Sequence, residues 1–173
     1  MERVVARLRG SVPMTGFLTG EIRRGARRIG FGGTTLDGKT FALAGVGPAG
    51  PAGGVRVGPY VVTTDELDAV GVPALDPRGD ARLVVLDEVG KMESFSVAFR
   101  DAVNRLLDGD AAVLGTVAAH GVGFPKKVRN DPRVTLVRMR RESRDGVVGE
   151  ILRRLAEAGI APDGRSRPRP EAR

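Results

Sequence analysis

The sequence predicts an α/β protein, and three observations support this fold class. Apolar residues run without a break from Leu83 to Leu86 and end in two acids, the pattern of a strand buried on both faces of a parallel sheet. The apolar spacing then changes to a helical period over Phe95–Leu107 and back to a strand at Ala111–Val117. Aromatic residues make up only 4% of the chain, so Val, Leu, Ile and Ala must fill the core, as in helix-covered strands.

Length and composition narrow the class of protein. At 173 residues, 41% of them hydrophobic, the chain has enough apolar material for one domain, which we place at 1–160. The absence of cysteine excludes disulfides, thiolate zinc sites and a cysteine nucleophile, and it fits a reducing compartment. The charged start Met1–Arg9 and the lack of any apolar run near ~18 residues argue against a leader or a membrane span. We therefore expect a cytoplasmic protein without a membrane partner.

The N-terminal part of the chain predicts a helix, a strand and a hairpin. Met1–Arg9 carries its apolar residues on one side and is followed by Gly10, where a helix would stop. Val12–Thr19 has the pattern of a strand, and polar residues follow it as far as Gly25. The Asp-Gly pair within Leu36–Gly38 lies between two apolar runs, which is a hairpin signal.

The remaining elements complete the expected domain. They are an extended segment at Val55–Val62, a helix from Thr63 to Val70, a last strand at Val134–Met139 and a last helix at Ser143–Ala158. Thr63 and Glu66 have the spacing of a capping box, which predicts where the first of these helices begins. Residues 161–173 contain almost nothing apolar to anchor them, so we expect a disordered basic tail.

Asp87 and Glu88 are the residues that point to chemistry. They lie at the carboxyl end of a buried strand, where an open parallel sheet holds its ligands. In a P-loop enzyme an Asp at this place holds Mg²⁺, and a neighbouring Glu orients and deprotonates the attacking water. The alternative is a strand that ends in a helix-capping Asp, with Glu88 in the first helical turn. The sequence that follows, Val89–Glu93, favours the catalytic interpretation.

Several blocks of the chain resemble the small P-loop nucleoside-triphosphatases of archaea, bacteria and some eukaryotes. The blocks are Gly16–Arg23, Arg27–Phe31, Leu36–Gly38, Val57–Tyr60, Leu83–Glu93, which is similar to the family's Asp-Glu-Ile-Gly-Lys-Met-Glu sequence, and Ser143–Asp145. The resemblance implies a RecA-like three-layer sandwich with a mostly parallel sheet and a β-hairpin insertion near residues 27–62. It also implies Mg²⁺-dependent hydrolysis of ATP, GTP and other nucleoside triphosphates to the diphosphate and phosphate.

The same resemblance assigns roles to individual residues. Asp87, in the Walker B segment, would hold the metal, and Glu88 would orient the water, with Lys91 assisting as a phosphate contact. Thr116 resembles the polar residue that senses the γ-phosphate, and Arg144 is a candidate phosphate or base contact. The residues expected at the nucleotide are Leu86, Asp87, Gly90, Thr116 and Arg144.

The phosphate-binding loop of this family is not found where the resemblance places it. In the family a strand, a Gly-x-x-x-x-Gly-Lys-Thr loop and a helix precede the strand equivalent to Val12–Thr19, and only the end of that helix matches here. We expect that the start was assigned too far downstream, the alternative being a complete but degenerate chain. Without the loop the triphosphate loses several charge-assisted hydrogen bonds, each contributing roughly 1.5–3 kcal/mol, so activity of the truncated chain is in doubt.

Gly33–Thr40 matches the letters of the phosphate-binding loop, yet we interpret it as a decoy. Such a loop must open a helix whose N-terminus faces the phosphates. The residues after Thr40 are too few and too rich in glycine to form that helix, and the segment contains the hairpin signal Leu36–Gly38. We therefore expect a hairpin here.

The net charge of +7 leaves two other functions open. One is a non-catalytic basic module that binds RNA or an acidic partner through Arg23, Arg24, Arg27, Arg28 and the tail. The other is phosphoryl transfer to a nucleoside or nucleic acid by a kinase that would use the same acids. Only four cations are Lys and Arg is spread along the whole chain, so we favour a composition bias over a nucleic-acid surface. The oligomeric state is not predicted.

Overall fold

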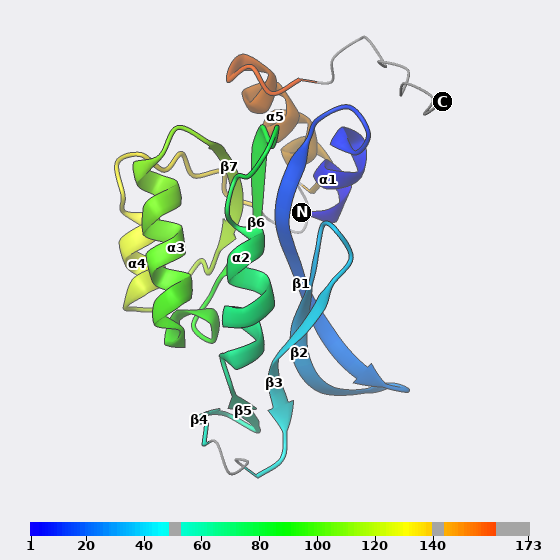
Figure 1. Ribbon diagram of the computed structural model, residues 1–173, viewed down its shortest axis with the longest axis vertical. Coiled ribbons are helices and arrows are strands. Elements are labelled where there is room, and N and C mark those ends of the chain that lie inside the picture. Colours follow the sequence, from blue (N-terminus) through cyan, green and yellow to red (C-terminus); the bar gives the residue numbers. More distant parts are fainter. Residues whose placement is uncertain (49–52, 140–143, 162–173) are drawn as a thin grey trace.

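The computed structural model describes residues 1–48, 53–139 and 144–161, with Arg144 and Asp145 described only in their backbone, and its helices lie on both faces of one sheet (Figure 1). The strands are β1 (Met14–Arg24), β2 (Arg27–Thr35), β3 (Thr40–Val46), β4 (Val55–Val57), β5 (Tyr60–Val62), β6 (Leu83–Val89) and β7 (Ala112–Val117). The helices are α1 (Glu2–Leu8), α2 (Val72–Ala74), α3 (Val97–Asp108), α4 (Phe124–Arg129) and α5 (Arg144–Glu157), with a π-helical turn at Leu67–Gly71 and a 3₁₀ turn at Glu93–Phe95.

The seven strands form a mixed sheet in the order β4-β5-β3-β2-β1-β6-β7. Only β1, β6 and β7 run parallel, and the other four ladders are antiparallel. The expectation of a mostly parallel sheet was therefore wrong. The physical reason is that the hairpin residues do not stand apart from the sheet. β1 extends beyond Thr19 to Arg24 and pairs with β2 along that whole length, so the antiparallel strands continue the parallel ones.

Each face of the sheet is covered by its own helices. On one face α1 and α5 pack on β6, in a cluster that contains Val4, Val5, Leu8, Leu83, Val85 and Leu155. On the other face α3 and the π-helical turn pack on the sheet, in a cluster that contains Phe17, Leu67, Val84, Leu86, Phe99 and Val103. The result is the expected three-layer α/β arrangement (Figure 1).

The central strand β6 is buried as its sequence predicts. Leu83 to Leu86 are each at most 2% exposed, because alternate side chains enter the two opposite clusters. Full burial of a Val or Leu side chain contributes about 1.5–3 kcal/mol relative to leaving it in water. The strand therefore stabilises both layers and fixes the position of the acids that follow it.

Two elements differ from the sequence-based expectation near the C-terminal half of the chain. Val134–Met139 forms no strand, and Leu136 and Met139 are more than half exposed. A strand needs a neighbour with which to exchange backbone hydrogen bonds, and within the described residues no strand pairs with this segment. The short helix α4 was not predicted, because its six residues are too few to show a helical period.

The capping box predicted at Thr63 is also wrong. The Thr63 N–H donates to the carbonyl oxygen of Leu43, at 3.0 Å, and is therefore held by β3. The Glu66 carboxylate accepts a hydrogen bond from the Ala42 N–H, at 2.6 Å, and does not reach back to Thr63. Long-range pairing with β3 has replaced the local contact, and the helical segment extends past Val70 to the end of α2.

Gly33–Thr40 is a β-hairpin, as expected. Gly33 lies in β2, Thr40 begins β3, and Thr34 and Thr40 are cross-strand partners. Gly38 occupies the turn with a φ of 95°, which glycine adopts without strain. No helix follows this segment, so it does not form a phosphate-binding loop. Among the helices of the described residues, none is long and apolar enough to cross a membrane.

Candidate active site

Asp87 and Glu88 lie where β6 emerges from the core at the carboxyl ends of the parallel strands. Asp87 is half-buried, Glu88 is exposed, and the peptide bond between them is cis. Leu86, expected at the nucleotide, is 2% exposed and points into the core on the α3 face. Only its backbone is therefore available to a ligand.

Thr116 lies beside Asp87 because β6 and β7 are neighbouring parallel strands, although their register shifts between Leu86 and Val89. Leu86 pairs with Gly115, and the next residue of each strand brings the Thr116 hydroxyl to the Asp87 carboxylate. Thr116 Oγ1 donates a hydrogen bond to Asp87 Oδ1. These two residues, which lie far apart in the sequence, are therefore in direct contact.

Gly90 lies between two carboxylates. A Cβ atom built on Gly90 would meet Glu93 Oε2 at 2.5 Å and Glu88 Oε1 at 2.7 Å, closer than side-chain contacts allow. The carboxylates of Glu88 and Glu93 therefore face the same small space beside the Gly90 backbone. Any larger residue at this position would displace them.

Glu93 is a site residue that the sequence analysis missed. It is 6% exposed, and burial raises its pKa to about 7, with smaller contributions from Glu88 and Asp87 opposed by backbone N–H groups of Glu93 and Gly90. Burial of its carboxyl group and the charge of Asp87 also raise the pKa of Glu88, although that side chain reaches the surface. Glu93 stands next to an amphipathic helix, where an acid is ordinarily a first-turn residue. Only its place in the Leu83–Glu93 motif could have singled it out.

The turn after β6 is held in place by hydrogen bonds from its C-terminal side. The Ser94 hydroxyl and backbone N–H both donate to the Gly90 carbonyl oxygen, and Arg100 Nη1 donates to the Ser94 carbonyl oxygen at 2.5 Å. Ser96 caps α3 by accepting the Phe99 N–H at 2.8 Å. Lys91 on this fixed turn is exposed. The side chain of Arg144 lies outside the described residues.

The carboxylates at the end of β6 do not make a complete Mg²⁺ site by themselves, and a substrate would have to supply further ligands. The described residues contain no group of three His, Cys, Asp or Glu side chains that could hold a metal by themselves. Mg²⁺ keeps several waters and commonly binds through one or two carboxylates together with substrate phosphates. Asp87, with one oxygen bonded to Thr116 and the other free of that contact, matches this pattern.

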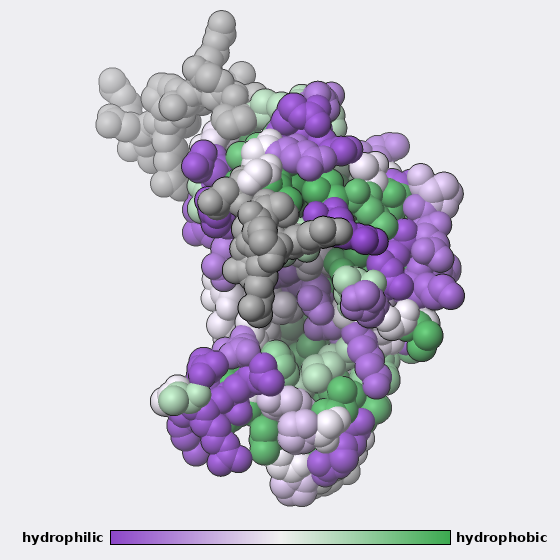
Figure 2. Space-filling model, turned by 180° about the vertical axis from the view of Figure 1, so that it is seen from behind, coloured by the Kyte–Doolittle hydropathy of each residue, from purple (hydrophilic) through white to green (hydrophobic). Residues whose placement is uncertain are grey.

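The basic hairpin tip between β1 and β2 is a hydrophilic projection at the lower left of Figure 2. Glu21 forms ion pairs with Arg23 and Arg28. Arg28 also lies over the Phe31 ring, 4.9 Å from its centroid, and donates to the Tyr60 hydroxyl at 2.7 Å. Two of the four arginines predicted as a polyanion surface are therefore engaged within the protein.

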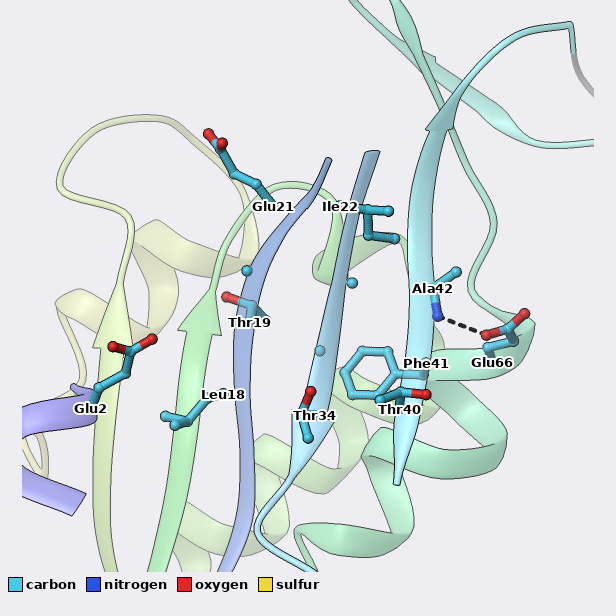
Figure 3. Close-up of a pocket in the computed structure, with 13 residues that line it drawn as sticks. Glu2, Leu18, Thr19, Glu21, Ile22, Thr34, Thr40, Phe41, Ala42 and Glu66 are labelled. Atoms are coloured by element: carbon cyan, nitrogen blue, oxygen red, sulfur yellow. Dashed lines mark hydrogen bonds between the residues drawn. The ribbon is translucent and has the colours of Figure 1, made fainter. Parts of the chain in front are cut away.

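A hollow of about 530 Å³, drawn in Figure 3, has neither Asp87 nor Glu88 in its lining. It lies on the face of β1, β2 and β3 beside Glu2, where Gly20, Gly32 and Ala42 leave the sheet uncovered. Its acids are partly engaged, since Glu66 binds the Ala42 backbone as drawn in Figure 3. It lacks the joined carboxylates and hydroxyl found at the end of β6. We therefore place the candidate active site at Asp87 and Glu88.

Comparisons with known proteins show the family to which the chain is related. A sequence model of the NTPase family matches residues 1–152. The chain is 35% identical over 138 residues to the nucleoside-triphosphatase THEP1 of Thermotoga maritima, covering 79% of this chain and 78% of the relative. It is 34% identical over 152 residues to the human cancer-related nucleoside-triphosphatase, covering 82% and 80%.

Two solved structures have the same architecture. The crystal structure of THEP1 from the hyperthermophile Aquifex aeolicus superposes with a TM-score of 0.74 at 29% identity, covering 89% of each chain. The solution structure of the human cancer-related nucleoside triphosphatase superposes with a TM-score of 0.76 at 32% identity, covering 91% of this chain and 89% of the other. The mixed sheet and its helices are thus shared with these proteins.

Proposed function

This chain belongs to the NTPase family, and we propose that the acids at the end of β6 carry out its reaction, the hydrolysis of a nucleoside triphosphate. The names of its relatives support the activity, which makes the protein a hydrolase of phosphoanhydride bonds. The observation that supports the assignment to these residues is the contact between Thr116 and Asp87 beside the exposed carboxylate of Glu88. ATP and GTP are the expected substrates.

In this proposal Glu88 orients the attacking water and accepts its proton. Its carboxylate is exposed, so a water can reach it, and its raised pKa makes it a stronger base than an ordinary glutamate. Glu93 acts as a positioning residue. It is buried, and its carboxylate faces the same space beside Gly90 as that of Glu88, so it restricts where the Glu88 carboxylate can lie. Lys91 would neutralise charge that develops on the transferred phosphate.

Asp87 would hold Mg²⁺. The bound ion would neutralise negative charge on the phosphates. The hydrogen bond from Thr116 fixes the rotamer of Asp87, so one carboxylate oxygen is presented to the ligand side. The Thr116 hydroxyl has a single proton, and this bond uses it. Contact with the γ-phosphate, the sensing role proposed for Thr116, therefore requires the hydroxyl to leave Asp87.

The remaining phosphate contacts of the proposal do not come from Gly33–Thr40, because that segment is a hairpin. Lys91 is the exposed cation of the turn that carries Gly90. Arg144 begins α5 and stays a candidate for a phosphate or base contact. Leu86 and Gly90 would contribute their backbones.

Phosphate release from ATP and GTP, measured with and without Mg²⁺, tests this proposal. Glu88→Gln keeps the shape of the side chain and removes the base, so kcat should fall by roughly 10²–10⁴-fold while nucleotide binding persists. Glu157→Gln, the same exchange at an exposed position of α5, should leave kcat unchanged. Equal rates for the two variants would contradict the role of Glu88.

A further inference from the structure

A second cavity, of about 330 Å³, lies between the turn after β6 and the loop before α4. The side chains that matter for its chemistry are Lys91, Phe95, Arg100, Val122 and Phe124. Ser94, which is bonded to the Gly90 carbonyl oxygen, also lines it. The turn that follows the candidate catalytic acids therefore also contributes to this cavity.

The lining of the cavity is positively charged and contains no acid. Lys91 is exposed and forms no ion pair within the described part of the chain. Arg100 donates to the uncharged backbone carbonyl oxygen of Ser94, and this contact does not neutralise its positive charge. Lys126 and Lys127 follow directly on α4. One of the chain's four lysines therefore lines the cavity, and two more follow its last lining residue, Pro125, along the chain.

The cavity also has apolar, partly aromatic walls. Phe95 and Phe124 are half-buried, with one side packed on the core cluster of the α3 face. Val122 is 84% exposed, the highest exposure among the large hydrophobic residues of the described structure. Folding alone does not account for this exposure of Val122, which shares the cavity lining with two aromatic rings and two cations. This lining fits a ligand that has both a flat apolar part and a negative charge.

We propose that this cavity binds single-stranded nucleic acid, with a base against Phe95 and Phe124 and the flanking phosphates at Lys91 and Arg100. Positively charged grooves with aromatic platforms bind single strands in this way, because every base has a π-face and every linkage has a charge. The hairpin tip offers a weaker alternative. Its Phe31 and Tyr60 are covered by Arg28, so it presents charge without a free aromatic face.

This binding site shares Lys91 with the proposed hydrolysis, but it can be tested without nucleotide. The measurement is fluorescence anisotropy of a labelled single strand of about 12 nucleotides, titrated with the whole protein at low salt. Val122→Glu places a carboxylate in the lining that also contains the two cations of the cavity. We expect it to raise Kd by about tenfold, since it opposes the phosphates directly.

Val55→Glu is the matched control, because it makes the same exchange at an exposed valine on β4, far along the sheet. Both variants change the net charge by the same amount. Val55→Glu should change Kd by less than about twofold. Equal weakening by the two variants would show that the overall charge binds the strand, and it would overturn the proposal.

The contribution of the bases is tested with an abasic strand of the same length and charge. In the wild type the abasic strand should bind about fivefold or more weakly than the intact strand, because stacking is lost. In Phe124→Ala most of this difference between the two strands should disappear. If the abasic strand or polyglutamate bound as tightly as the intact strand, the site would recognise negative charge alone and the assignment to nucleic acid would be wrong. No binding at low salt would also overturn it.

Discussion

The Thr116 hydroxyl on β7 donates a hydrogen bond to the Asp87 carboxylate on β6, joining the two parallel strands at the edge where the acids emerge. The contact links a proposed metal ligand to a proposed phosphate sensor. A ligand that binds Asp87 would therefore alter the hydrogen bond of Thr116, and a ligand of Thr116 would alter that of Asp87. This relationship can be tested by changing Thr116 alone.

Thr116→Val removes the hydroxyl and keeps the shape of the side chain. We expect kcat for phosphate release to fall by about tenfold and the Mg²⁺ concentration for half-maximal rate to rise, because Asp87 loses the bond that orients it. Thr116→Ser retains the hydroxyl and should keep most of the activity. If the two variants were equally impaired, the hydrogen bond would not be the cause.

Gly90→Ala should reduce activity much more than stability. The three atoms nearest to the added Cβ belong to the carboxylate groups at the ends of the Glu88 and Glu93 side chains, which can move, so the free energy of unfolding should change by less than about 1 kcal/mol. The displaced Glu88 should lower kcat by at least about tenfold. Gly149→Ala, on α5 with open space around it, is the control and should stabilise the protein slightly. Urea unfolding and phosphate release give the two readouts.

Glu93 should make the protein less stable as the pH rises toward neutrality. Its pKa is 4.5 in the unfolded chain and about 7 in the folded protein, so the folded state binds the extra proton between these values. The stabilisation is fully present below pH 4.5 and is lost as the pH passes through 7, a change of about 3 kcal/mol. Urea unfolding between pH 5 and 8 without metal should show this slope in the wild type. Glu93→Gln should flatten it, and an unchanged slope would assign the effect to another group.

Arg28→Ala should destabilise the hairpin region. Arg28 lies over the rings of Phe31 and Tyr60 and donates to the Tyr60 hydroxyl, so its loss should lower the free energy of unfolding by about 1 kcal/mol. Arg24 is exposed at the end of β1, and Arg24→Ala should lower the free energy of unfolding by less than about 0.5 kcal/mol. Equal effects would mean that charge, and not ring contact, determines the outcome.

Much of the candidate site could be predicted from the sequence, because its core is a local pattern. A run of four buried residues followed by Asp87 and Glu88 specifies a strand and the point at which it leaves the core. The mixed sheet, by contrast, was misjudged. Whether β2 pairs onto β1 or folds away depends on hydrogen bonds between distant residues, which no local period reveals.

The sequence by itself determined the central strand, the helix α3 that follows it and the hairpin at Gly33–Thr40, since side-chain period and turn residues act over a few neighbours. Only the tertiary structure decided that Thr116 would bond to Asp87 and that Glu93 would be buried beside Glu88. It also decided that Val134–Met139 would form no strand. These outcomes depend on register and on the presence of a pairing neighbour, which are properties of the whole sheet.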